Sequence, residues 1–173
     1  MQLDPKHFDI ILASLLNSWT LNRIRIMTIE EYADLSDYDS LCYWLEYGTK
    51  DVGAIGIMSL GKFELWKPRK GEDKKFKDGR FKMEGFYAYK SQKSNTLKQA
   101  FNKIRKSIFD IVKHSLNQNW EAIEAIEFHT IIKWKLAFLF SSKRLLPVYS
   151  MRSLLAIARG LGHTFTSKYN ILG

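Results

Sequence analysis

The sequence predicts an α+β fold: a helix-rich single domain with a small β-sheet built around a basic hairpin. Residues 95–118 place apolar side chains at helical spacing, whereas residues 62–66 and 80–90 alternate apolar and polar side chains as strands do. The 173 residues are 46% hydrophobic, which is enough to bury a core. We therefore expect one domain over residues 1–162, and residues 163–173, which carry no periodic signal, are expected to begin a linker.

The N-terminal third is predicted to be helical. Apolar side chains at helical spacing predict a helix over residues 5–19. Thr28 and Glu31 form the pattern of a capping box, in which the side chain of each residue accepts a hydrogen bond from the backbone N–H of the other. This pattern predicts that a helix begins directly after Thr28. A further short helix is expected in residues 36–48, where Gly48 supplies a stop signal.

The C-terminal half contains the strongest helix signal of the chain. In residues 95–118 an apolar stripe faces a row of basic side chains on the opposite side. Residues 119–128 predict a short acidic helix, and residues 151–162 predict a last helix that ends in glycines. Residues 130–140 are apolar almost throughout, so periodicity alone leaves a buried helix and a strand as alternatives.

The charge and the cysteine content restrict the function classes. A net charge of +9 favours a polyanionic partner, with nucleic acid the first candidate and an acidic membrane surface the second. The alternative is a soluble basic protein without an anionic partner. Cys42 is the single cysteine, which excludes a disulfide framework, and its apolar surroundings favour a core role. Because no run of 18 apolar residues occurs, we expect a soluble cytoplasmic protein with no membrane partner.

A near-match to a phosphate-binding loop occurs in the glycine-rich segment 56–63. Gly56, Gly61 and Lys62 fit the pattern, but Phe63 stands where the serine or threonine that ligates Mg²⁺ is required. The residues that follow read as a strand, whereas a phosphate loop leads into a helix. We therefore expect that this chain is not an NTPase, and the scattered histidines and acids predict neither another catalytic centre nor a metal or cofactor site.

The predicted hairpin concentrates positive charge and aromatic rings. Residues 62–90 hold ten basic and five acidic side chains, a net charge of +5. Cations bind phosphates, and aromatic faces stack on bases that have left the helix. Trp66, Tyr87 and Tyr89 are the ring candidates, and the alternative is that these rings belong to the core. Lys133 and Lys135, inside an apolar run, contact either a phosphate or the edge of the core.

Several strings in one order resemble a known family. They are WLEYGTKDVGAIGIMSLGKFELW, a basic loop followed by FYAYK, AFNKIRKSI, IIKWKLAFLFSSKRLLPVYS and LLAIARGLG. Over residues 40–162 this arrangement resembles the N-terminal domain of McrB-type, 5-methylcytosine-specific AAA+ GTPase restriction proteins. The resemblance implies a module that recognises double-stranded DNA carrying a modified base, an AAA+ GTPase domain in cis, and an McrC-like nuclease as partner.

We therefore predict the DNA-binding module of a modification-dependent restriction system in antiviral defence, without enzymatic activity of its own. Readout of the modified base by base flipping is expected, and contact with the base edge in the major groove is the alternative. A protein-interaction module and a small nuclease are the rival functions. The candidate DNA-binding residues are Lys62, Trp66, Lys67, Arg69, Lys70, Arg80, Tyr87, Tyr89, Lys90, Lys133 and Lys135.

Overall fold

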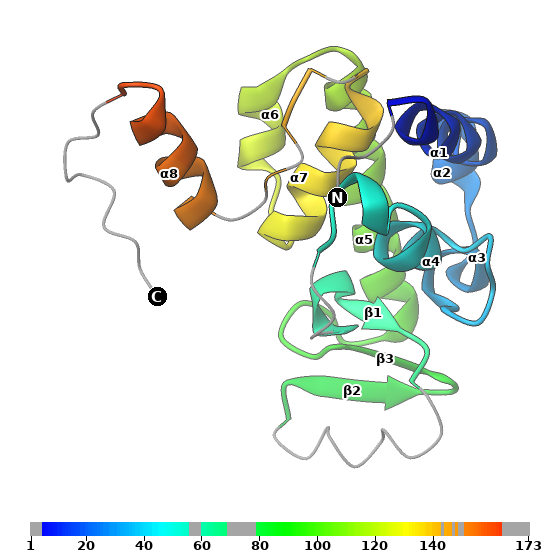
Figure 1. Cartoon of the computed structure of the whole chain (residues 1–173). Helices are drawn as coiled ribbons and strands as arrows, with labels where there is room; N and C mark the ends of the chain where they lie inside the picture. Colours follow the sequence, from blue (N-terminus) through cyan, green and yellow to red (C-terminus); the bar gives the residue numbers. More distant parts are fainter. Residues whose placement is uncertain are drawn as a thin grey trace.

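A helix-rich α+β domain with a small antiparallel sheet is observed, as the sequence predicts (Figure 1). The computed structural model describes residues 5–55, 60–68, 79–142, 144–146, 148 and 151–163. Within these ranges, no helix has the length and apolarity that crossing a membrane requires.

Short helices make up the N-terminal third. They are α1 (Pro5–Ser18), α2 (Leu21–Ile26), α3 (Ile29–Ala33), α4 (Leu41–Tyr43), the π-turn η1 (Trp44–Gly48) and the 3-10 turn η2 (Lys50–Val52). The capping box is confirmed, because the Glu31 N–H donates to Thr28 Oγ1 at 3.3 Å and the Thr28 N–H donates to Glu31 Oε2 at 2.9 Å. Helix α2 was not predicted, although Thr20 caps it through a bond to the Arg23 N–H.

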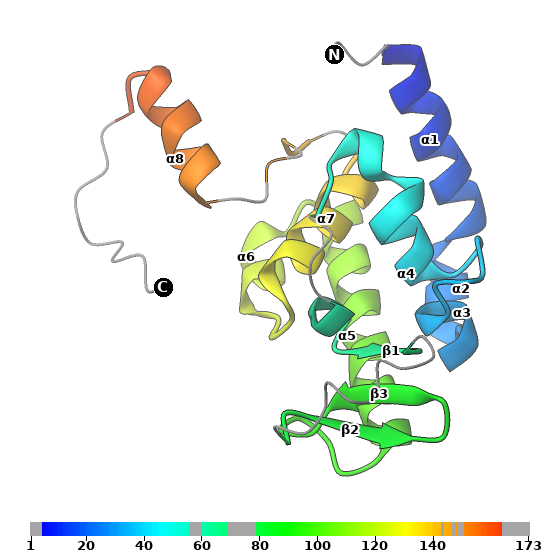
Figure 2. The same ribbon diagram turned by 60° about the horizontal axis from the view of Figure 1, so that its bottom comes forward.

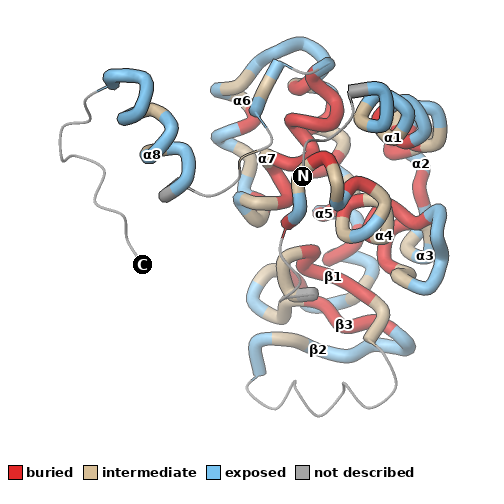
Figure 3. The backbone as a smooth tube through the Cα atoms, viewed as in Figure 1, coloured by how far each residue is buried: buried red, intermediate tan, exposed pale blue. Residues whose placement is uncertain are grey.

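Helix α5 (Leu97–Leu116) lies at the centre of the domain and packs against α7 (Thr130–Phe140) and α2. Its predicted apolar stripe is buried, apart from the partly buried first residue. Residues 130–140, for which the sequence left a helix and a strand as alternatives, form the helix α7. Residues on nearly every side of α7 are buried (Figure 3). Helices α6 (Trp120–Ala125) and α8 (Met151–Gly160) agree with the prediction, and α8 lies apart from the other helices in Figures 1 and 2.

The sheet differs from the expected hairpin. Its strands are β1 (Leu65–Trp66), β2 (Phe81–Glu84) and β3 (Tyr87–Lys90), in the order β1-β3-β2 among the described residues. Residues 80–90 were predicted as one strand, but Gly85 has a φ of +60° and turns the chain within them. Strand β3 is therefore central and pairs antiparallel with both neighbours. Residues 69–78 of the long connection between β1 and β2 lie outside the described residues.

The sheet lies at the N-terminal end of α5, below the helices in Figure 2. A 3-10 turn, η3 (Leu60–Phe63), leads into β1, and the Lys67 N–H donates to Ala33 O at 3.2 Å beside β1. Strand β3 is buried along most of its length, whereas β2 is exposed at the outer edge (Figure 3). This arrangement places the loop after β3 next to the first half of α5.

Candidate nucleic-acid interface

The three predicted stacking rings are buried. Trp66, Tyr87 and Tyr89 are 4%, 9% and 2% exposed, so the prediction that they are exposed for base stacking is wrong. Trp66 packs edge-on against Phe81, with ring centroids 5.1 Å apart. Tyr89 Oη donates to Asn95 O at 3.1 Å. The physical reason is packing on the faces of the sheet: Tyr87 and Tyr89 belong to the hydrophobic core, and β3 contacts α5.

Tyr87 is further fixed by an acidic partner. Its hydroxyl donates to Glu30 Oε1 at 3.3 Å, which joins the sheet to α3. Burial, followed by the charge of Glu30, raises the pKa of Tyr87 to about 12. The hydroxyl therefore remains a neutral hydrogen-bond donor under physiological conditions.

Two of the candidate lysines hold the fold together. Lys133 and Lys135 are 5% and 0% exposed, which makes the prediction of phosphate contacts wrong for both. Lys133 Nζ donates to Glu124 O at 2.9 Å, at the end of α6. Lys135 Nζ donates to Leu45 O and to Gly53 O, each at 2.7 Å. Both ammonium groups thus satisfy carbonyls at the ends of short helices, where cations are favoured.

The remaining candidates lie in several environments. Lys62 Nζ donates to Ile55 O at 2.6 Å, and Lys67 Nζ pairs with Asp34 Oδ2 at 2.6 Å, although the Lys67 side chain stays 41% exposed. Arg80 is exposed. Lys90 lines the cleft described below. Arg69 and Lys70 lie outside the described residues.

The glycine-rich segment does not lead into a helix N-terminus. Gly61 and Lys62 belong to the 3-10 turn η3, and β1 follows, as the sequence predicted. The lysine that would reach a phosphate in a phosphate-binding loop instead bonds the Ile55 carbonyl. Gly56 and the three residues after it lie outside the described part of the chain.

A cleft of about 460 Å³ opens between the loop after β3, the first half of α5 and the segment before α7. Four lysines converge on it: Lys90 and Lys93 from the sheet side, and Lys103 and Lys106 from α5. Ala100, Ile104 and Phe128 supply apolar lining. This combination of a cationic rim and an apolar lining suits a ligand that carries phosphate groups.

A buried carboxylate organises two of these lysines. Glu64 is 6% exposed, and its Oε1 accepts from Lys93 Nζ at 3.1 Å and from Lys90 Nζ at 3.4 Å. Its φ of +63° lies in the left-handed region that residues other than glycine rarely adopt. Lys90 N also donates to Glu64 O at 3.0 Å. The backbone and the side chain of Glu64 together hold this lysine pair at the cleft.

The electrostatics of the cleft are positive on balance. Two glutamates, Glu64 and Glu127, face the four lysines, and Asp110 pairs with Lys106 at 2.6 Å. Burial opposes the charge of Lys93, but its bonds to these two carboxylates outweigh burial and raise its pKa. Next to the cleft, burial and then the charges of Lys90 and Lys62 lower the pKa of His129. An ammonium cluster with fewer carboxylates than cations is suited to holding phosphate oxygens.

Sequence reasoning identified Lys90 but missed the other residues of the cleft. Lys103 and Lys106 were visible as the polar side of the helix over residues 95–118, which by itself indicates a solvated face. Their convergence with Lys93 depends on how the sheet packs against α5. No sequence pattern predicts the left-handed backbone conformation of Glu64.

Comparisons with family models, with curated proteins and with solved structures found no match. Within the described residues, no group of three or more His, Cys, Asp or Glu side chains is placed to hold a metal ion.

Proposed function

We propose that this chain is a DNA-binding domain that holds the phosphate backbone of duplex DNA in the lysine cleft. The observation that carries the proposal is the convergence of four lysines from two separate elements on one cleft. Lys103 and Lys106 are exposed on α5, where their ammonium groups bond Lys93 O and Asp110 Oδ2, whereas Lys90 and Lys93 are held by Glu64. Phosphate contacts of this kind fix the position of a protein on DNA without reading sequence.

The resemblance to McrB-type N-terminal domains supplies the specific target in this proposal. The domain would direct a restriction complex to DNA carrying a modified base, while the cis AAA+ GTPase domain and an McrC-like nuclease perform the chemistry. Because Trp66, Tyr87 and Tyr89 are buried, the proposal assigns them no stacking role. Readout of the modification is placed at the base edge in the major groove, where a methyl group on cytosine is accessible.

The test compares two double variants on the same helix. Lys103→Glu with Lys106→Glu changes the cleft, and Lys98→Glu with Lys113→Glu changes exposed α5 lysines that do not line it. Each contact with a phosphate contributes about −0.9 to the slope of log K against log[salt], so four contacts predict about −3.6. The cleft variant should flatten the slope by about 1.8, and the control variant should leave it unchanged.

The measurement is fluorescence anisotropy with one duplex of about 20 base pairs across a salt series. Unmodified, 5-methylcytosine, 5-hydroxymethylcytosine and N6-methyladenine versions of that duplex identify the preferred base. An equal decrease of the salt slope in the two variants would show that only the overall charge matters and would remove the cleft from the interface. Equal binding of all four duplexes would remove modification readout from the proposal.

A further inference from the structure

An exposed row of tyrosines lies on a part of the molecule that the DNA-binding proposal does not use. Tyr38 is 76% exposed and Tyr47 is 39% exposed, with the partly exposed Tyr43 between them. The Tyr38 and Tyr43 ring centroids are 5.0 Å apart, and those of Tyr43 and Tyr47 are 5.3 Å apart. The three rings therefore form one continuous aromatic surface, which we call the tyrosine row.

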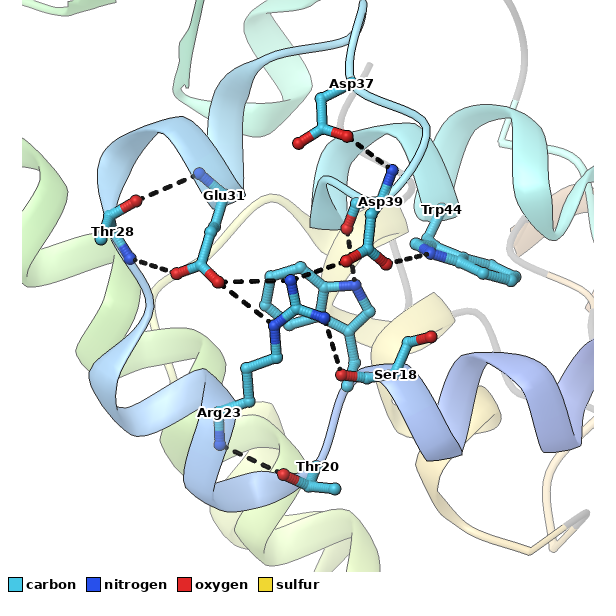
Figure 4. Close-up of polar contacts among 9 residues, drawn as sticks. Ser18, Thr20, Arg23, Thr28, Glu31, Asp37, Asp39 and Trp44 are labelled. Atoms are coloured by element: carbon cyan, nitrogen blue, oxygen red, sulfur yellow. Dashed lines mark hydrogen bonds and ion pairs between the residues drawn. The ribbon is translucent and has the colours of Figure 1, made fainter.

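The loop that carries Tyr38 is held by an ion-pair network (Figure 4). Arg23 bonds Asp39 Oδ2 at 2.8 Å and Glu31 Oε1 at 3.2 Å, and its guanidinium stacks 4.2 Å above the Trp19 ring. Trp19 Nε1 donates to the Asp39 carbonyl at 3.1 Å. Both the backbone and the side chain of Asp39, the residue after Tyr38, are thus tied to buried or half-buried groups.

The other two rings come from a helix of unusual geometry. Ser40 caps α4 by accepting from the Tyr43 N–H at 3.2 Å, and the π-turn η1 then carries Tyr47. Single π-turns occur frequently at functional sites. At Gly48, which ends this turn, a Cβ atom would lie 2.6 Å from the Trp44 ring, so the turn has no room for a side chain there. The row is therefore built on a fixed backbone rather than on a free loop.

The charge around the row is opposite to that of the whole chain. Residues 34–51 contain five carboxylates and one lysine, a net charge of −4, in a chain of net charge +9. Asp34 and Asp39 are paired with Lys67 and Arg23, which leaves Asp37, Glu46 and Asp51 as the carboxylates of this stretch that are not paired with a described lysine or arginine. Asp37 is exposed directly beside Tyr38, and Asp51 lies beyond Tyr47 with its side chain 38% exposed. A phosphate backbone is repelled by such a surface, whereas tyrosine faces and carboxylates both attract cations.

We propose that the tyrosine row is the docking site for a cationic segment, bearing arginine or lysine side chains, of another protein. Tyrosine supplies large, rigid contact area and is enriched at protein interfaces. The segment would lay its cations over the ring faces and against the carboxylates of residues 34–51. This inference is independent of the proposed DNA contact, since none of its residues lines the lysine cleft.

The test uses a defined probe, a peptide of about ten alternating arginine and proline residues, with an alternating glutamate and proline peptide as its charge control. Binding is followed by amide chemical shifts of the ¹⁵N-labelled chain. The cationic peptide should shift resonances of residues 36–51, and the acidic peptide should not. Tyr38→Ala with Tyr47→Ala should weaken binding about tenfold, whereas Tyr38→Phe with Tyr47→Phe should retain it because the ring faces remain.

Phe86→Ala is the matched control, because Phe86 is a 78% exposed ring at the β2–β3 turn, outside residues 34–51. Its affinity for the cationic peptide should equal that of the unaltered chain. Absent binding, equal binding to the tyrosine-to-alanine variant, or shifts at the row on addition of duplex DNA would overturn the proposal. Concentration-dependent self-association that protects the row would assign it instead to a second copy of this chain.

Discussion

At the residue scale, Lys135 illustrates how a charged side chain replaces a hydrophobic one in this core. It is fully buried in α7, yet its ammonium reaches the carbonyls of Leu45, Thr49 and Gly53 at 2.7, 3.4 and 2.7 Å. Leu45 lies in the π-turn, and Thr49 and Gly53 flank the 3-10 turn after it, where Thr49 O also accepts from the Val52 N–H at 3.2 Å. Burial lowers the pKa of Lys135 to about 7, which the charge of Glu46 partly opposes.

Replacing Lys135 with methionine tests this role, and its effect should depend on pH. At pH 9 the folded lysine is neutral and its two N–H groups satisfy the two short bonds. The methionine variant should then lose about 1–3 kcal/mol of unfolding free energy through unsatisfied carbonyls. Towards pH 7 the difference should shrink by about 2 kcal/mol, because the unfolded lysine keeps its proton while the folded one has a lowered pKa.

The sign follows from proton binding, since stability rises with pH wherever the unfolded state binds more protons. For Lys135 that window runs upwards from about pH 7 to the ordinary lysine pKa of 10.5. Urea denaturation of both proteins at pH 7, 8 and 9 measures the difference, in which other titrating groups cancel. Lys98→Met, at an exposed position of α5, is the control and should show no trend. A constant difference would mean that Lys135 keeps its ordinary pKa in the fold.

At the element scale, the helices and strands differ in how far the sequence alone predicts them. Helix α5 was predictable because one face is buried and the other solvated, so the period of 3.6 residues is visible. Helix α7 was ambiguous because it is buried on nearly all sides and has no such period. The prediction of one strand over residues 80–90 was wrong, because the alternation of apolar and polar side chains continues across the turn at Gly85. The burial of Tyr87 could not be predicted, because it depends on how the sheet packs against the helices.

The π-turn η1 gives a test at the same scale. At Gly48 a Cβ would lie 2.6 Å from the Trp44 ring, so alanine must displace that ring or open the turn. We expect Gly48→Ala to lower the unfolding free energy by about 1–3 kcal/mol, the usual cost of overpacking. Gly160→Ala, in α8, meets nothing within 4 Å and should be neutral or stabilising. Thermal and urea unfolding compare the two, and a neutral Gly48→Ala would show that the Trp44 ring moves freely.

At the scale of the whole molecule, charge is divided between two regions. Residues 34–51 are acidic, and the lysine cleft between β3 and α5 is basic, so a chain of net charge +9 still offers a surface that repels phosphate. In the proposed complex with DNA, this division favours an orientation in which the tyrosine row is directed away from the phosphates. The cleft and the row would then serve different partners at the same time.

The net charge of +9 also predicts opposite responses of folding and DNA binding to salt. In the free chain, repulsion among excess cations destabilises the compact state, so added salt should raise the melting temperature. Exposed ion pairs such as Lys106–Asp110 weaken with salt, but each contributes only about 0–1 kcal/mol. With duplex DNA at about 100 times its Kd in low salt, binding should add about 2.7 kcal/mol of stability.

Melting curves between about 20 and 400 mM NaCl, with and without duplex, measure both responses, because screening is nearly complete at the upper limit. The free chain should become more stable across the series, and the advantage given by DNA should disappear as phosphate contacts are screened. The Lys103→Glu, Lys106→Glu variant separates the two effects: its lower net charge should flatten the first response, and its altered cleft should reduce the second. A free chain that loses stability with salt would show that attraction within its ion pairs exceeds repulsion among its excess cations.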